Sequence, residues 1–163
     1  MTRKLGIFAA VIATLAITAS LAMAAITFHS GPTVTWNGDG SATATGNLSG
    51  LGNTPATAYL QITTSFSYTC QNKGGNSAPG QNSITVVGAP GSQDLDTTAK
   101  NGRSSLSVTA FPGTPASTIS GNAAGCPNGN WSGVNPTATG PASATLWIVQ
   151  GGTTIYGPTV FSS

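Results

Sequence analysis

The stretch that decides the fold is AYLQITTSFSYTC, residues 58–70. Its side chains alternate: one face carries Leu60, Ile62, Thr64, Phe66, Tyr68 and Cys70, and the other begins with Tyr59 and Gln61. A period of two residues is typical of a half-buried β-strand. We therefore predict a long strand whose even-numbered face looks into a core.

Similar alternation recurs along the chain in three segments, SATATGNL (41–48), SSLSVTAF (104–111) and ASATLWIVQ (142–150). Shorter or weaker strand patterns occur in TVTW (33–36), ITVV (84–87), WSGVNPTATGP (131–141) and TIYGPTVFSS (154–163). Turn formers such as NGDG (37–40), KNGR (100–103) and GGTT (151–154) separate them. The pattern predicts an all-β fold, a two-sheet antiparallel sandwich of about seven or eight strands. Residues 91–103 are expected to form a loop. The predicted core is Leu60, Ile62, Phe66, Leu106, Val108, Leu146 and Ile148.

The N-terminal segment has the order of a secretory leader. Arg3 and Lys4 precede an apolar run, and Ala22-Met23-Ala24 is a small-x-small site of the kind that signal peptidase cuts after. We predict a hydrophobic signal helix in residues 1–24 and a single sandwich domain in residues 25–163. Two alternatives stay open: a retained membrane anchor, and a pilin-like leader cut after Gly6.

Charge is sparse beyond that leader. The basic residues Lys73, Lys100 and Arg103 balance the acidic residues Asp39, Asp94 and Asp96, so the net charge is zero with His29 neutral. Such a chain lacks the basic footprint that binds nucleic acid or an anionic membrane. Contact with a membrane is expected only through the leader.

Two cysteines, Cys70 and Cys126, follow the leader. In an exported protein a pair of this kind is expected to form a structural disulfide, worth roughly 4 kcal/mol for a long enclosed segment. Each adjoins a cluster of turn formers, CQNKGGN (70–76) and CPNGNW (126–131). We expect the bridge to tie two loops or strand ends at one edge of the sandwich. The loop after Cys70 is interpreted as a stapled strand connection rather than a binding loop.

The order of these landmarks resembles a known group. GLGN (50–53), CQNKGGNSAPGQN (70–82), KNGRSSLSVT (100–109) and CPNGNW (126–131) together resemble small exported bacterial β-sandwich proteins with one disulfide, to which no activity is assigned. The KNGR turn before an alternating strand also resembles immunoglobulin-like modules of bacterial surface proteins. The resemblance implies an immunoglobulin-like sandwich and brings no catalytic residues.

Groups that could carry chemistry are few. His29 is the one histidine, and it lies in a predicted loose N-terminal tail. Asp94 and Asp96 are weak candidates for Ca²⁺ ligands, because calcium needs six to eight oxygens and such a loop supplies two carboxylates. No phosphate-binding or dinucleotide-binding spacing is present. We therefore predict a protein that is not an enzyme and has no cofactor.

The aromatic side chains offer the best ligand-binding candidates. Trp147 and Tyr59 are the candidates for a carbohydrate platform, and Trp131 is a further ligand-binding candidate, but the favoured interpretation is that Trp147 fills a second apolar layer. The predicted function is a secreted or cell-surface, non-catalytic protein with a structural or adhesion role. The alternatives are a carbohydrate-binding module and a pilin-like filament subunit. The expected partners are cell-wall polysaccharide or other surface proteins.

Overall fold

The computed structural model describes residues 25–98 and 103–163. Within these ranges the chain forms ten strands and one short helix: β1 (Thr27–Trp36), β2 (Ala42–Ser49), β3 (Ala56–Gln71), β4 (Ser77–Val87), β5 (Gly91–Leu95), β6 (Arg103–Ala110), β7 (Thr118–Ser120), α1 (Gly121–Ala124), β8 (Ser132–Ala138), β9 (Ser143–Gln150) and β10 (Thr153–Ser162). The leader of residues 1–24 and most of the KNGR turn lie outside the described residues.

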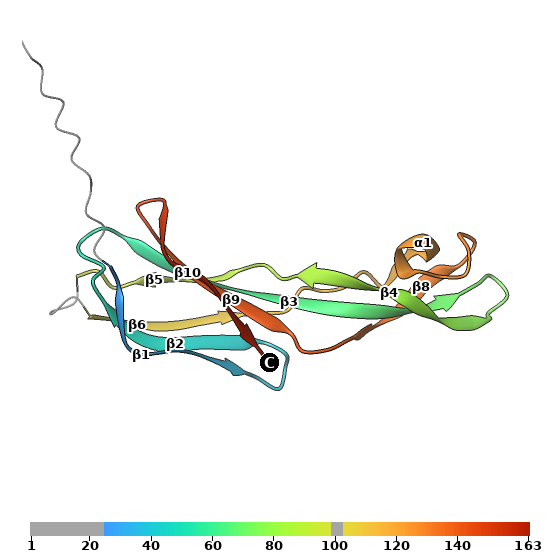
Figure 1. The fold of residues 1–163 in the computed structure, drawn as a ribbon, viewed down its shortest axis with the longest axis horizontal. Helices are drawn as coiled ribbons and strands as arrows, with labels where there is room; N and C mark the ends of the chain where they lie inside the picture. Colours follow the sequence, from blue (N-terminus) through green and yellow to red (C-terminus); the bar gives the residue numbers. More distant parts are fainter. Residues whose placement is uncertain (1–24, 99–102) are drawn as a thin grey trace, which may run out of the picture.

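The strands form two antiparallel sheets around the long strand that residues 58–70 predict. One sheet has the order β1-β2-β6, and the other has the order β10-β9-β3-β8-β7, with β4 and β5 also paired to β3. The first half of β3 lies between β9 and β5, and its second half lies between β8 and β4. As a result β3 runs along most of an elongated molecule (Figure 1).

The main core lies between the two sheets, at one end of β3. Six of the seven predicted core residues belong to it, which confirms the two-sheet arrangement: Leu60, Ile62, Leu106, Val108, Leu146 and Ile148. Each is at most 2 % exposed. Burial of such a side chain contributes about 1.5–3 kcal/mol, so this layer supplies most of the hydrophobic stabilisation.

The prediction for Phe66 is wrong. Its side chain is only partly buried and packs in a second cluster, around Tyr68, Cys70 and Ala124. The reason is the length of β3, whose second half extends past the β1-β2-β6 sheet. The pairing of β3 also shifts register between Ser67 and Thr69 against both of its neighbours.

Two of the strands that pair with β3 occupy segments that the sequence pattern predicts as loops. The strand β5 lies in the predicted loop of residues 91–103, and β4 begins at Ser77, inside the predicted connection after Cys70. Both pair with β3 through the backbone, while their side chains are mostly polar and exposed. Sequence periodicity reports buried faces, so strands that bury little apolar surface escape it.

The two sides of the sandwich are closed in different ways. On one side Phe28 of β1 and Tyr156 of β10 meet edge to face, with ring centroids 4.9 Å apart. On the other side the Gln93 side chain of β5 donates to the Ser105 carbonyl and accepts from the Ser107 amide of β6. Among the described residues no helix is long and apolar enough to span a membrane.

Candidate functional site

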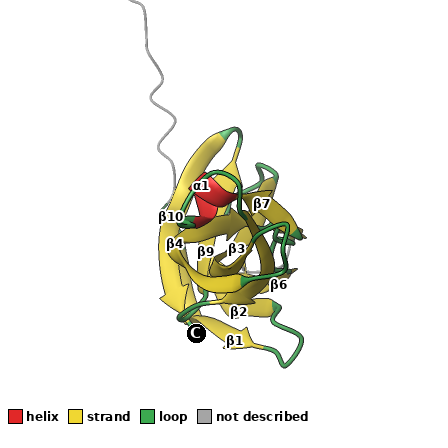
Figure 2. Ribbon diagram, turned by 90° about the vertical axis from the view of Figure 1, so that its right-hand side faces the viewer, coloured by secondary structure: helices red, strands yellow, loops and turns green. Residues whose placement is uncertain are grey.

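The far end of β3 forms a compact tip, held by the Cys70–Cys126 disulfide. The Cα atoms of the two cysteines are 5.6 Å apart, which confirms the predicted bridge. The bridge fastens the segment after α1 onto the buried end of β3, and Figure 2 looks along the molecule onto this helix. Each cysteine lies just before one of the two turn clusters, so the bridge brings both clusters together.

The turn between β3 and β4 makes one wall of the tip. The Asn72 Oδ1 atom accepts hydrogen bonds from the backbone amides of Gly74 and Asn76, both at 3.0 Å. Gly75 has a φ of +81°, a conformation that a residue with a Cβ rarely adopts. The sequence NKGGN thus dictates a tight turn that faces Asn72 inward.

The segment from α1 to β8 makes the other wall. Ser120 caps α1 by accepting from the Ala123 amide, and Gly125 ends it in the left-handed region. Next, Asn128 Oδ1 accepts from the Asn130 amide at 3.0 Å. The Asn128 carbonyl accepts from the Trp131 amide at 3.2 Å. This turn places the indole of Trp131 between the two walls.

Glycine lets the helix lie close to the sheet. A Cβ at Gly133 of β8 would come within 2.7 Å of the Ala124 Cβ and 2.8 Å of the Ile119 Cγ1. Side-chain atoms essentially never approach so closely, so any larger residue would lift α1 from β8.

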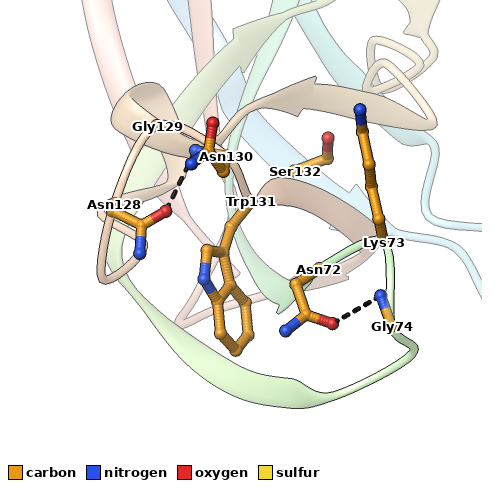
Figure 3. A pocket seen from close by; sticks show the side chains of 8 residues that line it. All are labelled: Asn72, Lys73, Gly74, Asn128, Gly129, Asn130, Trp131 and Ser132. Carbon is orange, nitrogen blue, oxygen red and sulfur yellow. Dashed lines mark hydrogen bonds between the residues drawn. The ribbon is translucent and has the colours of Figure 1, made fainter.

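The two walls enclose an open hollow of about 830 Å³. Figure 3 shows its lining, which consists of Asn72, Lys73, Gly74, Asn128, Gly129, Asn130, Trp131 and Ser132. Trp131 is partly buried against the disulfide cluster. Asparagine side chains from both loops therefore lie on either side of a single aromatic ring, and the Lys73 side chain lies at the rim and extends away from the ring (Figure 3).

The three aromatic candidates for ligand binding do not lie together. Tyr59 and Trp147 are direct cross-strand partners on β3 and β9, and their rings stack with centroids 5.3 Å apart and an interplanar angle of 14°. They lie on the outer face of the sheet, opposite the core. Trp131 precedes the pair Ser132–Gln71, which at about 3.3 Å per residue lies some 40 Å further along β3.

The histidine and the carboxylates considered as catalytic or metal-binding candidates lie on the sandwich rather than at the tip. His29 is within β1, not in a loose tail, which corrects that expectation; its Nε2 atom and Ser49 Oγ are 2.7 Å apart. Asp94 lies in β5 and accepts from Thr57 Oγ1 at 2.8 Å. Asp96 accepts from the amide and hydroxyl of Thr98. The described residues contain no group of three or more His, Cys, Asp or Glu side chains that could hold a metal ion.

Most of the residues that line the hollow were not singled out from the sequence. Trp131 is a ligand-binding candidate in the sequence, whereas Asn72, Asn128 and Asn130 lie in its two clusters of turn formers. The available signal was the pairing itself, because two Asn/Gly clusters next to bridged cysteines must lie close in space. The loop after Cys70 is the strand connection that was expected, and it also forms a wall of this hollow.

In comparisons with known proteins, no family model, no curated protein and no solved structure matches the chain.

Proposed function

We propose that this protein is a secreted or cell-surface, non-catalytic interaction domain of the immunoglobulin-like sandwich class, with an adhesion role. Its tip is the surface that recognises a partner. The observation that carries the proposal is the open hollow around Trp131, at the end of the molecule furthest from the main core. The disulfide supports the extracellular setting, because such bonds persist in oxidising compartments. The leader of residues 1–24 is then the export signal.

The arrangement of polar groups supports a binding role rather than catalysis. The one pair that resembles a nucleophile and its base is Ser49 with His29, and His29 is exposed on an open strand surface. Activated nucleophiles are found in enclosed sites that exclude water and hold the substrate. We therefore expect His29→Ala to leave every function of the protein intact and to loosen only the start of β1.

The experiment is a pull-down of intact bacterial cells and isolated envelope fractions with the oxidised protein. The Trp131→Ala variant should fail to capture this material. The Trp147→Ala variant, which loses an indole on the sandwich instead, should capture it as the wild type does. Retention that depends on Trp147 and is indifferent to Trp131 would move the recognition surface away from the tip. N-terminal sequencing of the exported protein tests the leader, with Ala25 as the expected first residue.

The second candidate function is carbohydrate binding on the outer face of the sandwich. The stacked Tyr59 and Trp147 rings favour it, since Gln61, Thr57 and Thr145 on the same face supply amide and hydroxyl groups around an aromatic pair. Against it, each ring already offers one face to the other. The pair of tryptophan variants decides between the two surfaces, because they remove one aromatic side chain from each.

A further inference from the structure

The hollow at the tip holds an excess of unused hydrogen-bond donors. The Oδ1 atoms of Asn72 and Asn128 accept from backbone amides. Among the described residues, the Nδ2 groups of these two side chains donate to no partner, and neither does the indole nitrogen of Trp131. In Figure 3 the Asn72 amide nitrogen points toward the indole, and the indole nitrogen lies on the side of Asn128. A ligand that supplies acceptors would satisfy these donors, while the Asn130 amide and the Ser132 hydroxyl can also meet a hydroxyl group of the same ligand.

The charge at the tip also favours a ligand that carries hydrogen-bond acceptors. Lys73 is the one ionisable side chain that lines the hollow, and within residues 25–98 and 103–163 it has no carboxylate partner. Asp94 lies near the opposite end of β3, next to Thr57. Asp39 lies in the turn between β1 and β2. A single unpaired ammonium in a nearly uncharged molecule creates a local positive potential.

The shape and the ring restrict the ligand further. An open hollow with one indole suits a sugar ring, whose apolar C–H face packs on an aromatic surface while its oxygens meet polar groups at the rim. One ammonium is too little for a phosphate backbone, which needs several cations. An apolar peptide would bury the two free amide groups without partners, at a cost for each.

We propose that the tip hollow binds a carboxylate-bearing saccharide, a hexuronate unit of an acidic polysaccharide. This inference rests on the proposed function and names its ligand class. Trp131 supports the ring, Lys73 pairs with the carboxylate, and the Nδ2 groups of Asn72 and Asn128 donate to ring and hydroxyl oxygens. The disulfide keeps the two asparagine walls at a fixed separation, because it lies at the base of both loops.

The test is calorimetric titration of the full, oxidised protein with a hexasaccharide of galacturonic acid and with the same oligomer fully methyl-esterified. The ester keeps the ring and removes the charge. We expect the acid to bind roughly tenfold more tightly, the effect of one charge-assisted hydrogen bond. Lys73→Gln should abolish the preference for the acid. Trp131→Ala should abolish binding of both oligomers. Trp147→Ala, the control, should leave the affinity for both oligomers unchanged.

Three results would overturn the inference: equal affinity for acid and ester, a preference that survives Lys73→Gln, or no binding of either oligomer by the wild-type protein. Lys73 is exposed, so its substitution leaves the packing of the tip intact and separates binding from folding. Trp131 packs partly on the disulfide cluster, and the thermal midpoint of Trp131→Ala is therefore measured alongside. If the protein captures envelope material through Trp131 but does not bind the hexuronate oligomers, the proposed function stands and this ligand class is rejected.

Discussion

Ile62 and Phe66 show how position along one face of β3 decides what a side chain contributes. Both residues are even-numbered and point to the same side of the strand. Ile62 is 0 % exposed between the two sheets, whereas Phe66 borders a smaller cluster and lines an open apolar cleft with Trp36 and Pro112. The larger side chain therefore buries less of itself than the smaller one.

We expect Ile62→Ala to lower the free energy of unfolding by about 2–5 kcal/mol, as for other buried aliphatic truncations. Phe66→Ala should cost less than half as much, because its ring is already partly in water and leaves a smaller cavity. Urea unfolding of the two variants gives the comparison. A larger loss from Phe66 would mean that the second cluster, and not the sandwich core, limits stability.

Asp39 provides a pH-dependent contribution at the turn between β1 and β2. Its carboxylate accepts from the Ser41 hydroxyl at 2.6 Å and from the Ser41 amide at 2.9 Å. These bonds, the hydroxyl first, lower the pKa of Asp39 from its ordinary value of 3.8. A carboxyl group whose pKa is lowered in the folded state stabilises the fold above its unfolded pKa, and that stability is lost as the pH falls through the folded pKa.

Wild type and Asp39→Asn should therefore differ in stability at neutral pH and converge as the pH falls below the folded pKa of Asp39. Chemical denaturation at a series of pH values measures the difference. Ser41→Ala is the matched control, since it removes the hydroxyl donor and should raise the pKa of Asp39. A difference between wild type and Asp39→Asn that stays constant down to pH 2 would contradict the argument.

At the scale of elements, the disulfide is the main constraint on the tip. It links residues 56 apart in sequence and joins the end of β3 to the segment after the four-residue helix α1. The buried hydrophobic cluster of this region consists of Tyr68, Cys70 and Ala124. A cluster of that size contributes little hydrophobic stabilisation, so the covalent link matters more here than in the sandwich.

We expect replacement of both cysteines by serine to lower the free energy of unfolding by roughly 4 kcal/mol, the chain-entropy value for a loop of this length. Hydrogen exchange should locate the change, with faster exchange in α1 and residues 126–131 than in β2 and β6. Binding at the tip should weaken in the same variant. Uniformly faster exchange across both sheets would show that the bridge supports the whole fold.

The elements also show what the sequence could predict. The alternating segments of β2, β3, β6 and β9 were predictable because each buries one apolar face. The strand β5 and the start of β4 were not, since Ser92, Gln93, Pro79 and Gln81 carry no apolar period and pair through their backbones. The disulfide followed from the cysteine count, but the hollow beside it did not, because the directions of the Asn72 and Asn128 side chains depend on turns that only the folded chain defines.

At the scale of the whole molecule, the strand β3 connects the sandwich, which contains the main core, to the tip, which contains the hollow. The even-numbered face of the first half of β3 is covered by the β1-β2-β6 sheet. The second half of β3 carries the tip with its disulfide (Figure 1). A continuous strand paired on both edges resists bending, so it holds the hollow at a fixed distance from the sandwich. This geometry is suited to presenting a recognition surface away from the body of the molecule.

The exposed edges of the sandwich favour a single chain over a filament. The edge strands β1 and β10 each contain a Gly-Pro pair, Gly31-Pro32 and Gly157-Pro158, and each has register shifts at that point. Proline lacks the amide that a new strand would need, and a bulge twists the edge away from it. The edges of β5 and β6 face each other and are clasped by Gln93.

We therefore expect the oxidised protein to sediment as a monomer across a wide concentration range, with the high frictional ratio of an elongated particle. Thr154→Lys, which adds a charge to the edge strand β10, is the control and should leave the sedimentation coefficient unchanged. If wild type assembles with rising concentration and Thr154→Lys reverses the assembly, strand addition at β10 takes place despite Pro158. The pilin-like alternative would then replace an independent domain as the better description of this molecule, because subunits of a filament must present an edge or a stem that a neighbour can complete.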